Sequence, residues 1–109
     1  KKYYLNFALD YGGHDEILRA VKKIVGKGLK SDEVTEQLIA ENLDTAQEPY
    51  PNPDLVIRTS GENRTSGFMP WQAAYAEYIF IDKYFPELTA GDIDWALAEY
   101  SRRQRRFGK

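Results

Sequence analysis

Two arginines and four hydroxyl side chains lie in a polar segment that begins at Arg58 and ends at Ser66. Arg58 directly follows the apolar run 55–57, and Arg64 comes six residues later. Two guanidinium groups with serine and threonine hydroxyls between them suit a phosphate or diphosphate, which each guanidinium can bind through two parallel hydrogen bonds. Open α/β sheets bind ligands beyond the carboxyl ends of their strands, so the position of Arg58 favours an anion-binding site.

A structural role is the alternative for these arginines, because Glu62 and Glu77 offer salt-bridge partners for Arg58 and Arg64. Glu77 stands directly before a second apolar run and has two interpretations of its own. It either pairs with a nearby arginine or binds a hard cation such as Mg²⁺, which takes carboxylates together with substrate phosphates. Glu62 either does the same work or orients an arginine. The residue pattern leaves both carboxylates open at this point.

A glycine pair marks a second place where chemistry is conceivable. Gly12–Gly13 separates an apolar, aromatic-rich run, Tyr3–Leu9, from an amphipathic segment that begins at His14. Such a junction either aims the amides of a helix N-terminus at a phosphate or only makes a tight turn. His14 is the only histidine in the chain. It is either a ligand or acid–base group, or a helix cap or surface residue.

Strands that alternate with helices must position these residues. Short apolar runs rich in β-branched and aromatic residues predict strands, and apolar residues at helical spacing predict helices. The order β-α-α-β-α-β-α predicts an α/β fold with part of a parallel sheet covered by helices. The expected strands are 3–9, 55–57 and 78–81, and the expected helices are 14–27, one capped by Ser31, 71–76 and one capped by Thr89 with Asp92.

Two groups of apolar residues are expected to be covered. The last helix should bury one stripe, made of Ile93, Leu97, Tyr100 and Phe107. A dense aromatic group should lie in the core or in an interface, because aromatic rings bury large areas. Its members are Trp71, Tyr75, Tyr78, Phe80, Tyr84 and Phe85. A chain of 109 residues has difficulty hiding so many rings alone, so we expect a dimer interface.

The bulk composition fits one modest globular domain, because 109 residues allow one real core but not two. A net charge of −2 gives no global attraction to nucleic acid or acidic membranes, and the absence of cysteine excludes disulfides and thiolate metal sites. No apolar run approaches the length that spans a bilayer. The basic run 102–106 allows nucleic-acid binding, but the net charge favours a solvated helix face or contact with an anion in a neighbouring subunit.

Three segments together closely resemble the C-terminal half of the cis-prenyltransferases, the family of undecaprenyl and dehydrodolichyl diphosphate synthases. They are LNFALDYGGHDEI, DLVIRTSGENRTSGFMPWQAAYAEYIFID and RRQRRFG, and the likeness runs nearly end to end. Ser60 in RTSGE resembles the archaeal and eukaryotic branch. The resemblance implies that residues 1–109 are the C-terminal part of a single cis-prenyltransferase domain whose N-terminal half lies upstream.

The resemblance also implies roles for individual residues. Arg58, Arg64 and Ser66 match the residues that bind the diphosphate of isopentenyl diphosphate. Glu77 matches the glutamate that contributes to the Mg²⁺ site or its surroundings. The final Arg-x-Gly, here Arg106 and Gly108, matches the motif that reaches the substrate diphosphate in the partner subunit of a homodimer.

Some features depart from the family pattern. Asn63 stands where bacterial members often have histidine, so we assign it no metal, and Pro70 stands where an apolar residue is commoner. The DGNGRW-type motif, which carries the catalytic aspartate, does not occur in this chain. We therefore expect no catalytic residue here and no activity of these residues alone.

The implied activity is cis-prenyl chain elongation. An allylic prenyl diphosphate is transferred onto isopentenyl diphosphate to give a long-chain polyprenyl diphosphate, and this chain supplies the isopentenyl diphosphate site. We expect a cytoplasmic homodimer that binds no nucleic acid, with room for peripheral membrane contact through the lipid product. The alternative is a non-catalytic regulatory subunit of a prenyltransferase complex. Such subunits tend to lose the loop arginines, so the presence of Arg58 and Arg64 favours the catalytic kind.

Overall fold

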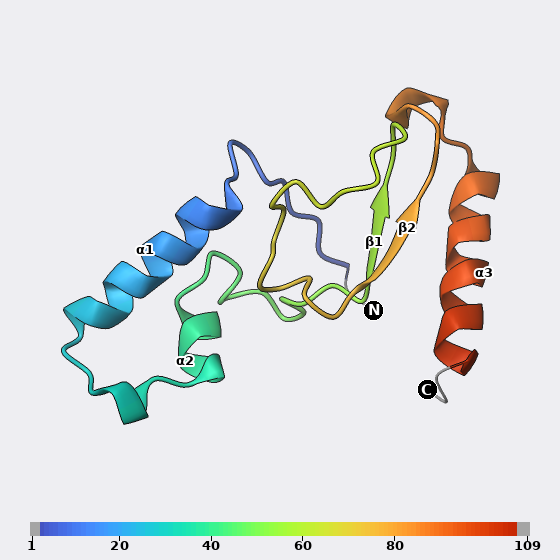
Figure 1. Ribbon diagram of the computed structural model, residues 1–109. Coiled ribbons are helices and arrows are strands. Elements are labelled where there is room, and N and C mark those ends of the chain that lie inside the picture. The colour runs from blue at the N-terminus through green and yellow to red at the C-terminus, as the bar shows by residue number, and fades with distance from the viewer. Residues whose placement is uncertain (1–2, 107–109) are drawn as a thin grey trace. The chain divides into compact units, whose positions relative to one another are not determined.

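The computed structural model describes residues 3–106, which form an α/β fold (Figure 1). The described part of Lys1–Pro51 with Gly67–Trp71 makes one compact unit, and Asn52–Ser66 with the described part of Gln72–Lys109 makes another. The elements, in chain order, are α1 (Gly13–Gly26), the 3₁₀ turn η1 (Ser31–Glu33), α2 (Glu36–Glu41), β1 (Leu55–Arg58), β2 (Glu77–Phe80), the 3₁₀ turn η2 (Phe85–Glu87) and α3 (Ala90–Arg106). Within the described residues, no helix is long and apolar enough to cross a membrane.

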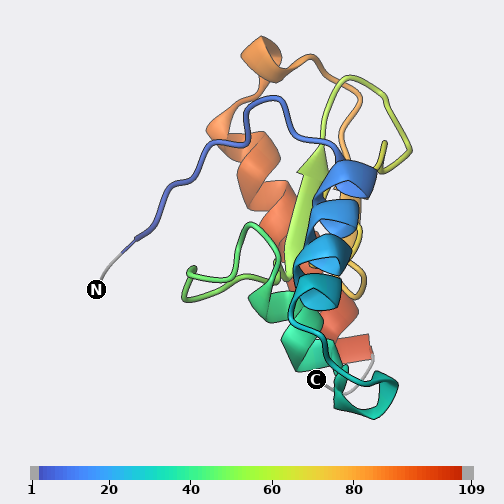
Figure 2. The ribbon, with the colours of Figure 1, turned by 90° about the vertical axis from the view of Figure 1, so that its left-hand side faces the viewer.

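The first unit is built on α1, which lies beside α2 (Figure 1 and Figure 2). Ala20 and Ile24 of α1 and Leu43, after α2, are buried. The apolar residues whose helical spacing predicts one buried stripe are Ile17, Leu18, Val21, Ile24 and Val25. Of these only Ile24 is buried, so the predicted stripe is mostly wrong within this unit. Other apolar residues of α1 are exposed, namely Leu18, Val21 and Val25. The helix therefore buries only part of its apolar surface within this unit.

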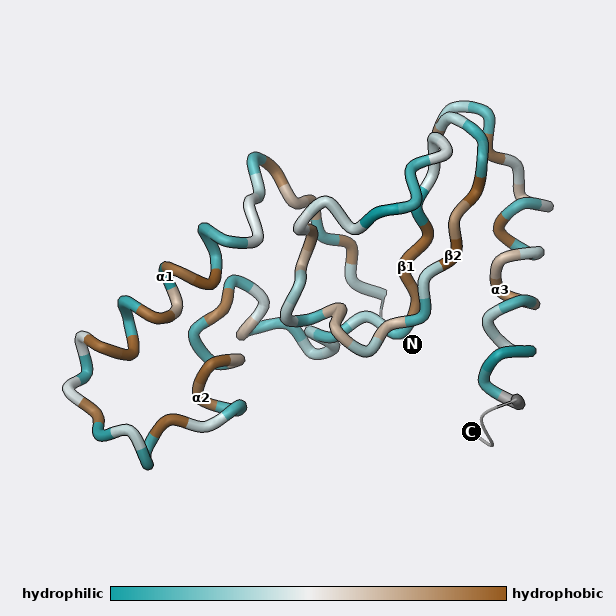
Figure 3. The backbone as a smooth tube through the Cα atoms, in the orientation of Figure 1, coloured by the Kyte–Doolittle hydropathy of each residue, from teal (hydrophilic) through white to brown (hydrophobic). Residues whose placement is uncertain are grey.

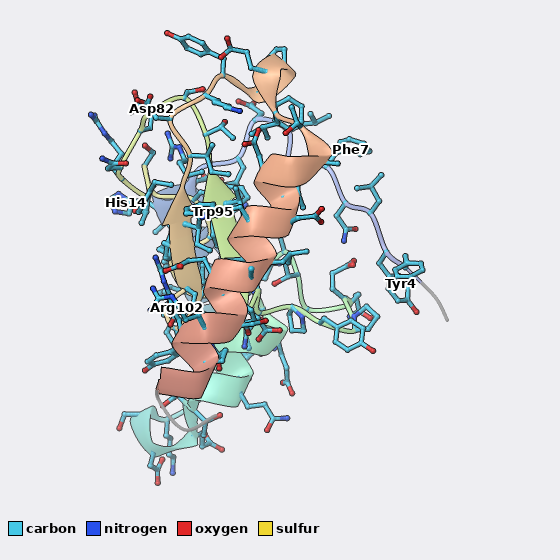
Figure 4. The ribbon with its side chains drawn as sticks, turned by 90° about the vertical axis from the view of Figure 1, so that its right-hand side faces the viewer. Tyr4, Phe7, His14, Asp82, Trp95 and Arg102 are labelled. Carbon is cyan, nitrogen blue, oxygen red and sulfur yellow. The ribbon has the colours of Figure 1, made fainter. Side chains whose placement is uncertain are left out.

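The predicted strand at 3–9 is wrong. The segment has no strand alongside it among the described residues. Its side chains are exposed, Tyr4 at 53% and Phe7 at 78% (Figure 4). Apolar and aromatic composition does not suffice for a strand, because the backbone N–H and C=O groups must pair with a neighbouring strand. A side-chain hydrogen bond from Asn6 Nδ2 to Glu48 Oε1, 2.9 Å, ties the segment to its unit.

The second predicted helix begins later than expected. Ser31 opens the 3₁₀ turn η1 rather than an α-helix. The helix starts at Glu36, where the Thr35 hydroxyl accepts a hydrogen bond from the Leu38 N–H at 3.1 Å. Thr35 is therefore the N-cap, because it satisfies one of the helix's first unpaired N–H groups. Both Ser31 and Thr35 precede acidic residues, so local sequence alone did not distinguish them.

The predicted helix at 71–76 is also wrong, because these residues form consecutive turns. The Ala76 N–H donates to the Ala73 carbonyl at 3.1 Å, an i to i+3 hydrogen bond typical of a turn. Six residues cannot offset the cost of nucleating a helix by propensity alone.

β1 and β2 form the parallel sheet of the second unit. Leu55 pairs with Glu77 and Arg58 pairs with Phe80, so both strands end at the same edge. The tube is brown over most of β1 but only over the second half of β2 (Figure 3). The strands predicted at 55–57 and 78–81 are confirmed to within one residue at each end. Together with the helices, they confirm the α/β class.

α3 begins at the predicted capping box. The Thr89 N–H donates to Asp92 Oδ2 at 2.9 Å, and the Asp92 N–H donates back to Thr89 Oγ1 at 3.2 Å. Lys83 Nζ pairs with the same Asp92 carboxylate at 3.0 Å. The Thr89 contacts and the Lys83 pair lower the pKa of Asp92. The reciprocal hydrogen bonds fix where the helix starts.

The inner face of α3 differs from the predicted stripe. Ala96 is fully buried against Ile79 and Ile81, and Tyr100 packs against this cluster. Ile93 and Leu97 are 37% and 50% exposed, so their predicted burial is wrong within this unit. The small Ala96 lets the helix approach the strand closely, which turns the larger neighbours outward. The fourth member of the predicted stripe, Phe107, lies outside the described residues.

Candidate functional site

The polar segment 58–66 forms a loop that leaves the carboxyl end of β1. Arg58 is the last residue of the strand and is half-buried, and its Nη1 donates to the Arg64 carbonyl oxygen at 2.9 Å. Arg64 and Ser66 are exposed. The hydrogen bond folds the loop back on the strand end, so the structure brings the backbone of Arg64 to the guanidinium of Arg58.

A second set of contacts ties the start of the loop to the chain that follows β2. The Ser60 N–H donates to the Lys83 carbonyl at 2.6 Å. Gly61 has a φ of +67°, and a Cβ at this position would lie 2.7 Å from Oδ1 of Asp82. Asp82 comes two residues after the end of β2 (Figure 4). The loops after both strands therefore meet at one sheet edge, as the parallel register requires.

Backbone strain is concentrated in and just after this loop. Of the four non-glycine residues with positive φ in the described chain, three are Ser60, Ser66 and Met69. Such conformations cost about 1–3 kcal/mol each and persist only where the surroundings impose them. They cluster at ligand-binding sites in other proteins. The loop is thus held in a shape that its local sequence would not adopt alone.

Part of the salt-bridge alternative is realised here. Arg64 Nε lies 3.2 Å from Glu62 Oε1, with the two side chains 73% and 43% exposed. A pair this exposed contributes about 0–1 kcal/mol, because solvent screens it. A diphosphate can therefore displace Glu62 from the Arg64 guanidinium at little cost. The exposed cation of Arg64 remains available as part of an anion site.

Glu77 pairs with an arginine, but not with Arg58 or Arg64. Arg103 of α3 places Nη1 3.4 Å from Glu77 Oε1 and donates from the same nitrogen to the Tyr78 carbonyl at 2.8 Å. Residue-type reasoning missed Arg103 because it lies in the basic run 102–106, which resembles a solvated face. The available signal was its spacing of four from Glu99, the spacing of helix salt bridges.

Glu99 completes this cluster. Its carboxylate accepts hydrogen bonds from Arg102 and from Arg103 Nε, the latter at 3.1 Å. Arg102 and then Arg103 lower the pKa of Glu99 to about 2. Glu99 thus holds Arg103 on the face of α3 from which Arg103 reaches the start of β2.

The candidate metal site has one protein ligand, Glu77, and no preformed set of further ligands among the described residues. Across residues 3–106, no three histidine, cysteine, aspartate or glutamate side chains form a cluster that could hold a metal ion. Mg²⁺ commonly binds through one or two carboxylates together with substrate phosphates and water. A single carboxylate at Glu77 fits that kind of site and not one built from protein ligands alone. The predicted metal role of Glu77 remains a prediction.

Three other predicted residues remain untested. Arg106 is the last residue of α3, and Gly108 lies outside the described residues. His14 is the second residue of α1 and is exposed (Figure 4). The surface-residue interpretation of His14 agrees with this position, and its role as a ligand stays a prediction.

Comparison with known proteins places these features in a family. A model described as "Putative undecaprenyl diphosphate synthase", of the prenyltransferases, matches residues 1–108. The chain belongs to this prenyltransferase family. It is 47% identical to a tritrans,polycis-undecaprenyl-diphosphate synthase (geranylgeranyl-diphosphate specific) of Methanocaldococcus jannaschii, over 99% of this chain and 40% of that protein. It is 48% identical to an isoprenyl transferase of Staphylococcus saprophyticus, over 95% of this chain and 42% of that protein.

The fold matches a solved prenyltransferase-family structure as well. Lavandulyl diphosphate synthase from Lavandula x intermedia, in complex with dimethylallyl diphosphate, superposes with a TM-score of 0.78 at 38% identity. The match covers 83% of this chain and 40% of that one. The chain thus spans less than half the length of these relatives. Archaeal and bacterial relatives are about equally identical to it, so the predicted archaeal-like branch stays a prediction.

Proposed function

We propose that this chain provides the isopentenyl diphosphate half of a cis-prenyltransferase active site, as the C-terminal part of a single domain. The observation that carries the proposal is the loop at the end of β1. There the Arg58 guanidinium is pinned at the strand end, and Arg64 and Ser66 are exposed on the same loop. These residue types match a diphosphate in charge and in hydrogen-bond geometry.

The proposed reaction joins two diphosphate esters. The double bond of isopentenyl diphosphate attacks the allylic carbon of the second substrate, whose diphosphate leaves with the bonding electron pair. A proton is then lost to give a new cis double bond. Arg58 and Arg64 hold isopentenyl diphosphate by its own diphosphate and so orient its double bond toward the allylic substrate. The catalytic aspartate is proposed to lie upstream of this chain.

Mg²⁺ fits this proposal through Glu77. The carboxylate would hold the ion together with phosphate oxygens, and the bound ion would stabilise negative charge on the leaving diphosphate. The Arg103 contact holds the Glu77 side chain at 3.4 Å while leaving it 27% exposed. Arg103 therefore orients the Glu77 carboxylate. A metal ion could replace Arg103 as the positively charged partner of this carboxylate.

A homodimer in the cytoplasm is part of the proposal. Several large side chains near the sheet and α3 are exposed, namely Tyr75, Tyr84, Phe85, Trp95 and Leu97. Of the six aromatic residues predicted to lie in the core or an interface, four are exposed, namely Tyr75, Phe80, Tyr84 and Phe85. Exposed apolar area of this kind supports an interface, through which the partner's Arg-x-Gly would reach the substrate. Membrane contact would come through the lipid product.

Calorimetric titration of the complete protein tests the function. Isopentenyl diphosphate should bind, and isopentenyl alcohol, which lacks the diphosphate, should not. Arg64→Ala should weaken the first titration, because it removes an exposed cation from the loop. Equal binding of the alcohol and the diphosphate would refute an anion-recognition site here.

A further inference from the structure

The segment that follows the candidate loop is packed against the start of α1, within the first unit. Gly13, the first residue of α1, is buried. A Cβ at Gly13 would lie 2.1 Å from the Gly67 carbonyl oxygen and 2.8 Å from Cδ of Pro70. Contacts below 3.0 Å essentially never occur for a real Cβ. Glycine at this position is therefore a requirement of close packing between backbone segments.

Gly12 differs from Gly13, although the two are neighbours in sequence. A Cβ at Gly12 would lie 3.6 Å from the Asp15 Cβ, which is an ordinary contact. Its φ of −132° and ψ of 126° are extended values that any residue adopts. The glycine pair predicted from sequence therefore has one sterically essential member, which faces backbone of the chain itself.

Tyr11 also contacts the segment 67–70. Its ring packs edge-on against the ring of Phe68, with centroids 5.4 Å apart. Its hydroxyl donates to Glu16 Oε1 and accepts a backbone hydrogen bond from Met69. The phenol is thereby a bridge between α1 and the residues just after the loop. Burial, followed by the hydrogen bond to Glu16, raises the pKa of Tyr11 well above its ordinary value.

Glu16 makes this bridge rigid. It lies on the inner face of α1 and is 1% exposed, an uncommon position for a carboxylate unless it is paired. Its other oxygen accepts the Asp44 N–H at 2.8 Å. Asp44 in turn receives two hydrogen bonds from Arg19, at 2.7 and 2.9 Å. The Tyr11 hydroxyl thus donates to a buried carboxylate whose second oxygen is held by the Asp44 N–H.

The geometry points to Tyr11, Gly13 and Glu16 as positioning residues. They hold the turn 67–70 against α1 and so fix the end of the diphosphate-binding loop at Ser66, which is joined to Gly67 by a peptide bond. The role rests on the proposed function of that loop. Its other end is fixed separately, by the Arg58 and Ser60 hydrogen bonds at the sheet edge. Holding the turn that follows Ser66 in one conformation lowers the conformational entropy that this residue loses on binding.

Gly13→Ala in the complete protein tests the anchor, with Gly12→Ala as the matched control. To restore 3.0 Å at Gly13, the Gly67 carbonyl must move by 3.0 − 2.1, or about 0.9 Å. Misplacement of a positioning group by about 1 Å can lower catalytic efficiency by up to about 100-fold. We expect the loss to appear as a rise of about tenfold or more in the KM for isopentenyl diphosphate. The KM for the allylic diphosphate and kcat should change far less. Gly12→Ala should leave all three within about twofold, because its Cβ makes only an ordinary contact, 3.6 Å from the Asp15 Cβ, and its backbone angles suit any residue.

A readout without substrate separates the anchor from the proposed function. Amide hydrogen exchange in peptides covering 61–69 should be faster in Gly13→Ala than in wild type and Gly12→Ala. If wild type does not bind isopentenyl diphosphate, the proposed function fails, and the exchange comparison still judges the anchor. Wild-type exchange and an unchanged KM in folded Gly13→Ala would overturn the inference.

Tyr11→Phe covers the case in which Gly13→Ala does not fold. This change keeps the ring on Phe68 and removes only the hydroxyl that links Glu16 with Met69. It should raise the KM for isopentenyl diphosphate severalfold and speed exchange in 61–69, with kcat little changed. If Gly13→Ala is insoluble and Tyr11→Phe behaves as wild type in both measurements, the anchor is refuted.

Discussion

Replacement of Arg58 by alanine is the most direct perturbation of the proposed site. The Arg58 side chain leaves the last residue of β1, and one of its N–H groups donates to the Arg64 carbonyl at 2.9 Å. Alanine removes this internal tie and the proposed contact with the diphosphate together. A hydrogen bond to a charged group contributes about 1.5–3 kcal/mol. Because 1.4 kcal/mol is tenfold, the affinity for isopentenyl diphosphate should fall by about 10- to 100-fold.

Arg58→Lys divides the effect into charge and geometry. Lysine retains the positive charge but cannot present the planar fork of donors. We expect the affinity of Arg58→Lys for isopentenyl diphosphate to lie between those of wild type and Arg58→Ala. Lys22→Ala is the control, because it removes one positive charge from an exposed position on α1.

Calorimetry with isopentenyl diphosphate, together with steady-state kinetics at saturating allylic substrate, gives both the affinity and the kinetic effect. Circular dichroism establishes that the variants are folded. A folded Arg58→Ala protein with wild-type affinity and kcat/KM would refute the assignment of the loop. An equal loss in Lys22→Ala would show that only net charge matters.

Three further predictions follow from local geometry. Glu77→Gln should raise the Mg²⁺ concentration needed for half-maximal activity. It should change the free energy of unfolding by only about 0–1 kcal/mol, because the ion pair with α3 is partly exposed. An unchanged Mg²⁺ requirement would exclude Glu77 as a ligand. In denaturant titrations, Gly61→Ala should be destabilising by about 1–3 kcal/mol, because the φ of +67° at this position strains any residue that has a Cβ. Gly26→Ala, in open space at the end of a helix, should be stabilising by about 0.5–1 kcal/mol. The same sign for both would contradict the steric argument. The pKa of Glu99, lowered from 4.5 to about 2, implies that its stabilisation of α3 is present above pH 4.5 and is lost as the pH falls through about 2, so helical ellipticity in that window should decline more in wild type than in Glu99→Gln.

Local patterns were sufficient where neighbouring residues decide the outcome. The strands at 55–58 and 77–80 follow from short, β-branched apolar runs, and the start of α3 follows from the Thr89 and Asp92 pair. The candidate loop was recognised by residue type, because two arginines and several hydroxyls after a strand suit an anion, and its role in binding remains a prediction. Family membership rested on long matching segments and was confirmed by the comparisons.

Features that depend on a distant partner were not predictable in this way. The run 3–9 has strand-like composition, but no strand pairs with it among the described residues. The burial of Ala96 rather than Leu97 depends on how closely α3 approaches β2, which helical periodicity does not specify. The partner of Glu77 is 26 residues away in sequence, so no local pattern identifies it.

The glycine pair separates the two kinds of information. The sequence by itself determined that the strand-like segment must turn at Gly12–Gly13 into a helix, because the residue types on both sides and the conformational freedom of glycine are local properties. Only the tertiary structure decided that Gly13, and not Gly12, is sterically essential. Its Cβ position is occupied by the Gly67 carbonyl, and a contact between residues 54 positions apart is a property of packing and not of either segment.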